Sequence, residues 1–160
     1  MLRRPSLRFL TALIVPAFVA GAVFAADHED AGKTDVQKAR HHHYEELGDA
    51  FKAVRDNSRG DNPDWAKIEK AAQVVNDASI DQQRWFPKGS GPESGKTRAL
   101  PEIWTKPADF TAAQKMLSDR APKLLAAAKA KDAAGLQAAF KDAGGACKNC
   151  HDSFRAPEDK

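Results

Sequence analysis

The stretch ACKNCHDSFR at residues 146–155 decides how the rest of the chain is interpreted, because it holds both cysteines of the 160-residue sequence. Cys147 and Cys150 lie three positions apart, and His151 follows directly. The apolar residues before and within this stretch recur at steps of three and four, which is the period of an α-helix. Because residues three or four apart share one face of a helix, we expect both thiols and the imidazole to point into the protein interior.

The pattern Cys-x-x-Cys-His is the attachment sequence for haem of the c type, in which the thiols bond to the porphyrin and the imidazole binds iron. Given two cysteines and five histidines in the chain, its chance occurrence is on the order of one in 2,500. A disulfide between Cys147 and Cys150 would close a tiny loop and add little stability. A thioredoxin-like motif needs a βαβ setting, and structural zinc needs four ligands. The sequence therefore predicts one covalently bound haem c.

Four helical patterns fill most of the chain. The first runs from Thr34 to about Asn57, and the second starts with Asn62 as its cap and Pro63 as its first residue. The third begins near Pro107, and Asp132 caps the fourth. Their apolar stripes are Val36, His43, Leu47, Ala50, Phe51 and Val54; Trp65, Ile68, Ala72, Val75 and Ser79; Phe110, Leu117, Leu124 and Ala128; and Leu136, Phe140, Ala143, Cys147, His151 and Phe154.

The sequence has no alternating strand pattern. Four amphipathic helices with mostly short connections predict an all-α fold, an antiparallel four-helix bundle with haem attached to the C-terminal helix. The Gly- and Pro-rich segment 86–101 predicts a surface loop, and residues 102–105 a short turn. Pro122 predicts a kink or short break in the third helix. Gly144 and Gly145 are compatible either with the close approach of a flat haem or with a bend.

The first 25 residues have the pattern of a secretory signal peptide. Arg3, Arg4 and Arg8 form a basic region, an apolar stretch follows, and the small residues before Asp27 predict cleavage after Ala25. An uncleaved membrane anchor is the rival interpretation. Residues 26–33 are then a flexible N-terminal tail, and residues 34–160 form the bundle. We expect the protein to be exported to the periplasm.

Export also changes the charge argument. The chain has 25 basic and 22 acidic residues, and three of the arginines lie in the predicted signal peptide. The mature chain is therefore close to neutral, so no basic surface for nucleic acid is expected.

A haem motif at the C-terminal end of a four-helix bundle resembles the class II cytochromes c, of which cytochrome c prime is the type. The resemblance covers nearly all of the mature chain. It rests on residues 40–48 in the first helix, on the Phe-Pro-x-Gly-Ser at 86–90, on the Ala-x-Pro-Glu-Ile-Trp at 99–104 and on residues 147–155.

This resemblance implies a role for each matching residue. Cys147 and Cys150 would hold the haem, and His151 would be the proximal iron ligand. Arg40 would lie near a haem propionate, since guanidinium and carboxylate groups pair well. Arg155 matches a basic residue beside the proximal imidazole; a solvated arginine at a helix C-terminus is the other interpretation.

The distal face of the iron is less determined. Low-spin relatives have a methionine where this chain has Tyr44, and Met116 is the only methionine after the predicted cleavage site. A neutral phenol is a poor iron ligand, so Tyr44 is expected to pack over an open site. On a second interpretation His43 is the sixth iron ligand, and on a third the sixth ligand is water. His41 and His42 receive no role.

Two functions follow from these two distal arrangements. An open site favours electron transfer, binding of small diatomic gases such as NO and CO, or both. The alternative is a low-spin cytochrome with His151 and His43 as axial ligands, which transfers electrons without binding gases. We expect no enzymatic activity, because His43 is the only candidate for distal acid–base chemistry. Expected partners are redox proteins, and the resemblance suggests a homodimer through the first two helices.

Overall fold

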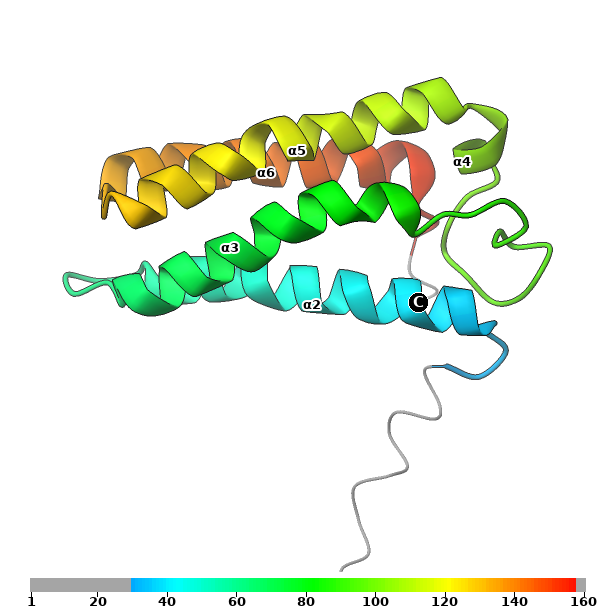
Figure 1. Cartoon of the computed structure of the whole chain (residues 1–160), viewed down its shortest axis with the longest axis horizontal. Coiled ribbons are helices and arrows are strands. Elements are labelled where there is room, and N and C mark those ends of the chain that lie inside the picture. The colour runs from blue at the N-terminus through cyan, green and yellow to red at the C-terminus, as the bar shows by residue number, and fades with distance from the viewer. Residues whose placement is uncertain (1–29, 158–160) are drawn as a thin grey trace, which may run out of the picture.

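The computed structural model describes residues 30–157, which form a bundle of four long helices (Figure 1). The long helices are α2 (Asp35–Asn57), α3 (Trp65–Asp81), α5 (Pro107–Lys129) and α6 (Ala133–Phe154). A 3-10 turn, η1 (Gln82–Arg84), and the short α4 (Glu102–Thr105) flank the long loop between α3 and α5. The predicted signal peptide lies outside the described residues. Among the described helices, none has the length and apolar character needed to cross a membrane.

Three of the helices begin at side-chain caps. Thr34 and Gln37 form a reciprocal capping box at the start of α2. Asp132 accepts a hydrogen bond from the amide of Gly135 at 3.0 Å and starts α6, as predicted. The predicted start of the second helix is wrong by two residues: Asp64, not Asn62, is the cap, because its carboxylate accepts from the amide of Lys67 at 3.2 Å.

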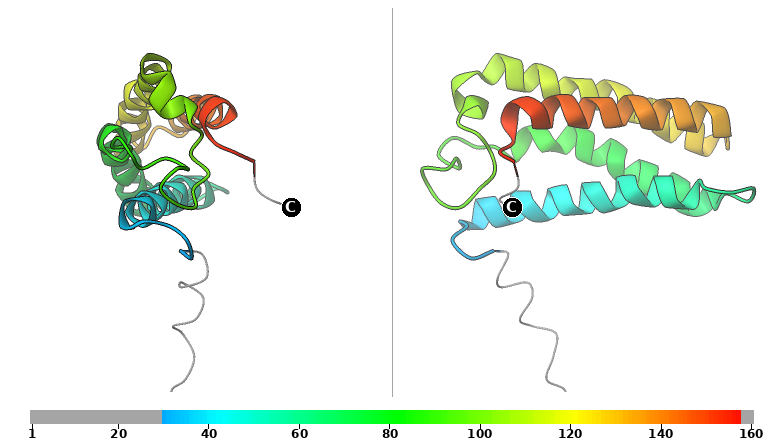
Figure 2. Two further views of the ribbon diagram at one scale, coloured as in Figure 1. Left: turned by 90° about the vertical axis from the view of Figure 1, so that its right-hand side faces the viewer. Right: turned by 180° about the vertical axis from the view of Figure 1, so that it is seen from behind.

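The helices pack in the order α2, α3, α5, α6 around one core. Neighbours in this order share extensive interfaces, whereas the backbones of α2 and α6 hardly meet. The end-on view in Figure 2 shows this open side between α2 and α6. The fully buried core side chains are Val54, Ile68, Ala72, Val75, Ala121, Leu124 and Ala143.

The buried face of α2 is rotated relative to the predicted stripe. Val36 is 43% exposed and His43 is also exposed, so both were placed wrongly on the apolar face. The face that packs inward instead carries Gln37, Arg40 and Tyr44 before Leu47. Polar side chains at steps of three and four hid this face from a search for apolar residues.

The predicted break at Pro122 is absent, since α5 runs unbroken past it. Pro122 lies on the exposed side of the helix, where water can solvate the carbonyl that loses its amide partner. Helix α6 likewise runs without interruption through Gly144 and Gly145. The structure therefore excludes a helix break at this glycine pair, while a bend and the close approach of a haem both stay open.

Candidate haem site

The open side between α2 and α6 is bridged by two aromatic rings at its middle. Phe51 of α2 and Phe140 of α6 stack with ring centroids 4.0 Å apart and planes inclined by 13°. Gly144, one turn further along α6, faces Phe51, and a β-carbon there would lie 3.6 Å from the ring. Beyond this stack, α2 presents Tyr44 and α6 presents Cys147, and both side chains pack against the edge of the core.

The two cysteines are free thiols and half-buried on the side of α6 next to this opening. Burial raises the pKa of both, that of Cys150 to about 11. Contrary to the expectation that all three groups point inward, His151 is exposed. The reason is that the buried face of α6, which includes Ala143, Ala146 and Phe154, ends short of the angular position of His151.

The surroundings of His151 favour its neutral form. Partial burial lowers the pKa of the imidazole, and the positive charges of Arg155 and Arg98 lower it further, while Asp152 acts against them. A neutral imidazole retains the lone pair that a metal ligand needs.

Backbone hydrogen bonds fix the segment that carries these two arginines. The amide of Leu100 donates to the carbonyl of Phe154 at 3.0 Å, and the amide of Ala156 donates to the carbonyl of Arg98 at 2.8 Å. The Arg98 side chain also donates from Nε to the Ala156 carbonyl at 3.0 Å. The end of the long loop is thereby tied to the end of α6, beside His151.

Tyr44 of α2 packs against the same core cluster as Cys147. Its ring meets Trp85 edge-on at 4.9 Å, and its hydroxyl donates to Oε1 of Gln82 over 3.4 Å. Burial raises the pKa of Tyr44, and negative charge on Cys150 would raise it further. The phenol is therefore neutral at physiological pH.

His43 points elsewhere. Its imidazole stacks on Trp85 with centroids 4.8 Å apart and an interplanar angle of 19°, and the side chain is exposed. Helix α2 thus turns Tyr44, not His43, toward the core edge where Cys147 lies.

Arg40 is buried, with 5% of its surface exposed, and holds the long loop. Its two terminal nitrogens donate to the hydroxyl and carbonyl of Ser90, each at 2.9 Å, and to the hydroxyl of Thr97 at 3.0 Å. The guanidinium also lies over Phe86, 4.8 Å from the ring centroid. The role of Arg40 beside a haem propionate stays a prediction. Holding the long loop is a second role, which the sequence did not indicate.

Sequence reasoning missed the polar residues that support this arrangement. Gln37 donates to the carbonyl of Gly91 at 2.9 Å, and Gln82 accepts from Tyr44. A signal for Gln37 was available, because it lies one turn before Arg40, to which the family resemblance gives a role at the haem. No local signal distinguished Gln82 from any other glutamine.

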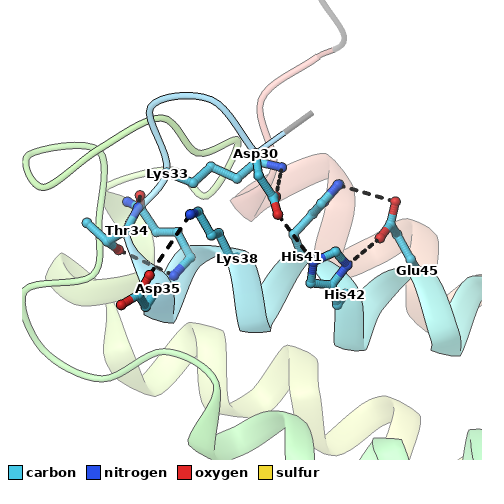
Figure 3. A network of polar contacts seen from close by, with 9 residues as sticks. Asp30, Lys33, Thr34, Asp35, Lys38, His41, His42 and Glu45 are labelled. Atoms are coloured by element: carbon cyan, nitrogen blue, oxygen red, sulfur yellow. Dashed lines mark hydrogen bonds and ion pairs between the residues drawn. The ribbon is translucent and has the colours of Figure 1, made fainter. Parts of the chain in front are cut away.

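His41 and His42 belong to a surface network at the start of α2 (Figure 3). Glu45 contacts His41 at 3.3 Å and His42 at 3.1 Å, and His42 also contacts Asp30 at 3.3 Å. Lys33 pairs with Asp30 at 3.0 Å. In residues 30–157 no group of three or more metal-binding side chains is arranged to hold an ion, so these histidines remain without a role in the site.

Met116 lies on a different side of α6. Its sulfur accepts a hydrogen bond from Asn149 at 3.3 Å, and both residues line a surface hollow of about 370 Å³ between α5 and the end of α6. Asn149 is two positions from Cys147, so the two side chains leave α6 in different directions. The exclusion of Met116 as an iron ligand stays a prediction from the sequence.

The residues present fit a covalently bound haem. Two half-buried thiols and an exposed imidazole lie on one edge of α6, next to the side of the bundle where the backbones of α2 and α6 hardly meet. The family model described as Cytochrome C′ matches residues 35–155, which include all four long helices and the Cys-x-x-Cys-His motif. The chain belongs to the cytochrome c′ family.

Individual relatives agree with this assignment. Cytochrome c′ of Rhodopseudomonas palustris is 34% identical over 88% of this chain and 94% of its own length. Two solved structures of cytochrome c prime variants from Alcaligenes xylosoxidans, one with nitric oxide and one with carbon monoxide bound, are each 33% identical with a TM-score of 0.69. In both comparisons the alignment covers 77% of this chain and 95% of the other chain.

Family membership establishes the cofactor class. Cytochromes c′ are non-enzymatic haem proteins, and the Cys-x-x-Cys near the C-terminus implies a covalent haem c. The family is typically periplasmic.

Proposed function

We propose that this cytochrome c′ has an open distal iron position beside Tyr44, and that it binds small diatomic gases, transfers electrons, or does both. The observation that carries the proposal is that α6 and α2 place complementary residues on the two sides of the opening. Cys147 and His151 lie on α6, and the neutral Tyr44 lies on α2, where its hydroxyl already donates a hydrogen bond to Gln82. A haem held there would supply an iron that can take up such gases when its sixth position is vacant.

In this proposal each residue of the chain has a separate task. Cys147 and Cys150 attach the cofactor, and His151 binds the iron from the α6 side. Tyr44 covers the opposite side without ligating, because a neutral phenol is a poor iron ligand. Desolvation, together with the charges of Arg155 and Arg98, lowers the pKa of the imidazole and so favours the neutral form that binds a metal.

The structures of relatives with nitric oxide and carbon monoxide support the gas-binding part. The alternative low-spin arrangement would require the imidazole of His43 to leave its stack on Trp85. We therefore favour the open site.

Optical spectra of the ferric and ferrous protein, with and without carbon monoxide, test the open site. We expect a broad high-spin ferrous spectrum that shifts on addition of carbon monoxide. Sharp low-spin bands that do not change on addition of carbon monoxide would instead show that a side chain of the protein occupies the sixth coordination position of the iron. The variant His43→Ala then decides whether that ligand is His43, because only a ligating histidine would change the bands when removed.

The double variant Cys147→Ala/Cys150→Ala tests the attachment. We expect its haem to be lost completely on acid–organic extraction, whereas the unmodified protein retains haem through denaturation. Covalent haem surviving in the double variant would contradict the assignment. We further propose export to the periplasm with cleavage after Ala25, which the N-terminal mass of the secreted protein measures.

A further inference from the structure

Two buried glutamines join η1 to α5 inside the bundle. Gln82 and Gln114 are 3% and 4% exposed. The side-chain amide of Gln114 donates to the backbone carbonyl of Gln82 at 3.0 Å. The amide of Gln82 donates in return to the backbone carbonyl of Gln114 at 3.3 Å and to that of Ser79 at 3.1 Å.

These bonds fix the orientation of the Gln82 amide. Its NH₂ group faces two carbonyl oxygens, which only accept hydrogen bonds. Turning the amide over would place Oε1 against both carbonyls and leave buried acceptors without donors, at a cost in stability. Oε1 must therefore face the other way, toward Tyr44.

The orientation of this amide also determines where the hydroxyl proton of Tyr44 lies. An amide oxygen accepts only, so the contact of 3.4 Å between Tyr44 Oη and Gln82 Oε1 requires the phenol to donate. A phenol has a single O–H, and that proton is directed at η1 rather than across the opening toward α6.

We propose that Gln82 is a positioning residue that keeps the hydroxyl proton of Tyr44 out of the gas pocket and so lowers the affinity for dioxygen relative to carbon monoxide. The inference rests on the proposed open site beside Tyr44. Hydrogen-bond donors in a distal pocket are among the features that decide oxygen binding, and here the nearest hydroxyl is engaged elsewhere.

The test compares four forms of the haem-loaded protein: unmodified, Gln82→Met, Tyr44→Phe and the double variant. Methionine keeps the length of the glutamine side chain and removes the acceptor, so the phenol is free to turn. In Gln82→Met we expect a lower C–O stretching frequency of the carbon monoxide complex and an oxygen-to-carbon-monoxide affinity ratio about fivefold higher, equal to one net hydrogen bond. In the double variant the effect of Gln82→Met should be absent, so that the double variant matches Tyr44→Phe alone.

Gln114→Met is the matched control. It removes the hydrogen bond from the Gln114 side chain to the carbonyl of Gln82. Oε1 of Gln82 still faces Tyr44, because the Gln82 amide still donates to the backbone carbonyls of Ser79 and Gln114. We expect its C–O stretching frequency to stay at the unmodified value. An equal shift in both glutamine variants would mean general loosening of the core and would overturn the specific role of Gln82.

Other outcomes also decide the matter. A C–O stretch that differs between the double variant and Tyr44→Phe alone would mean that Gln82→Met acts without the hydroxyl, which contradicts the inference. No shift in Gln82→Met would contradict it as well.

Failure of the open site itself is recognised separately. If the unmodified protein takes up no carbon monoxide, the proposed function fails, and with it the role of Gln82 in gas selectivity. The hydrogen bond between Tyr44 and Gln82 can then still be tested in the low-spin ferrous protein. Tyr44 is the single tyrosine of the chain, so a labelled tyrosine reports on this residue alone. Tyrosine labelled with ¹³C at Cζ gives one signal, and an identical signal in Gln82→Met would overturn the hydrogen bond too.

Discussion

At the scale of single residues, Tyr44 connects the site to stability at high pH. Burial raises its folded-state pKa above the ordinary value of 10.0. For an acidic group with a raised pKa, the unfolded chain loses its proton first as pH rises. The stability contributed by the neutral phenol is therefore complete below pH 10 and declines above it, by up to about 1.4 kcal/mol per pH unit.

Denaturant unfolding between pH 9 and pH 11.5 measures this decline. We expect the free energy of unfolding to fall more steeply in the unmodified protein than in Tyr44→Phe, which has no phenol to ionise. All other ionisable groups are the same in both proteins, so the difference between the two curves isolates Tyr44. Parallel curves would mean that the phenol is as accessible to water in the folded state as in the unfolded one.

Gly144 and Gly145 are adjacent in α6 but have different surroundings, so the same substitution should have different effects at the two positions. A β-carbon at exposed Gly145 would lie 3.6 Å from Nη1 of Arg120, an ordinary contact. Gly145→Ala should therefore raise the free energy of unfolding by about 0.5–1 kcal/mol through helix propensity. Gly144 faces the opening beside Phe51, where a bound haem needs the space.

For Gly144→Ala we expect a smaller gain or a loss in the haem-loaded protein. Thermal or denaturant unfolding of both variants, together with their optical spectra, makes the comparison. Equal gains without a spectral change would show that the haem does not approach Gly144, and would remove the close-approach interpretation of the pair.

At the scale of elements, the loop between η1 and α4 depends on α2 for its conformation. Arg40 and Gln37 donate to the carbonyls and hydroxyls of the loop around Ser90, and Trp104 donates to the carbonyl of Pro87 at 3.1 Å. Arg40→Ala leaves buried acceptors unpaired and should cost about 2–3 kcal/mol of stability. Amide hydrogen exchange of residues 89–97 should rise by a larger factor than that of α5.

Lys38→Ala is the control for this experiment. Lys38 lies on the same helix, and its ion pair with Asp35 is exposed and spans 4.0 Å, so little stability should be lost. If Arg40→Ala and Lys38→Ala behave alike, Arg40 does not hold the loop. A change in the haem spectrum of Arg40→Ala, at unchanged loop exchange, would favour the propionate contact instead.

At the scale of the whole molecule, two exposed apolar side chains bear on the homodimer that the family resemblance suggests. Val36 of α2 and Ile80 of α3 are 43% and 55% exposed. They lie at the same end of two antiparallel neighbours, because α2 begins where α3 ends (Figure 1). We propose that they contribute to the homodimer through α2 and α3 suggested by the family resemblance.

Sedimentation equilibrium of the haem-loaded protein tests this. The double variant Val36→Lys/Ile80→Lys should dissociate at concentrations where the unmodified protein is a dimer, since charges at an interface core are unfavourable. The optical spectrum should be unchanged, which separates loss of the dimer from loss of the fold. A monomeric unmodified protein would contradict the proposal directly.

The sequence by itself determined the helices and the cofactor class. Apolar periodicity and caps such as Thr34 and Asp132 are local features, and a Cys-x-x-Cys-His motif is read along the chain without knowledge of the fold. Glycine and proline placed the long loop, although the exposed Pro122 did not break its helix, because solvent replaces the lost partner there.

Only the tertiary structure decided which residues face the site. The inner stripe of α2 is polar at Gln37 and Arg40, so hydrophobicity could not reveal that Tyr44 packs inward and that His43 stacks outside on Trp85. The contact between Tyr44 and Gln82 joins residues 38 positions apart. Such a hydrogen bond depends on the packing of α2 against α3 and η1, and sequence spacing carries no information about it.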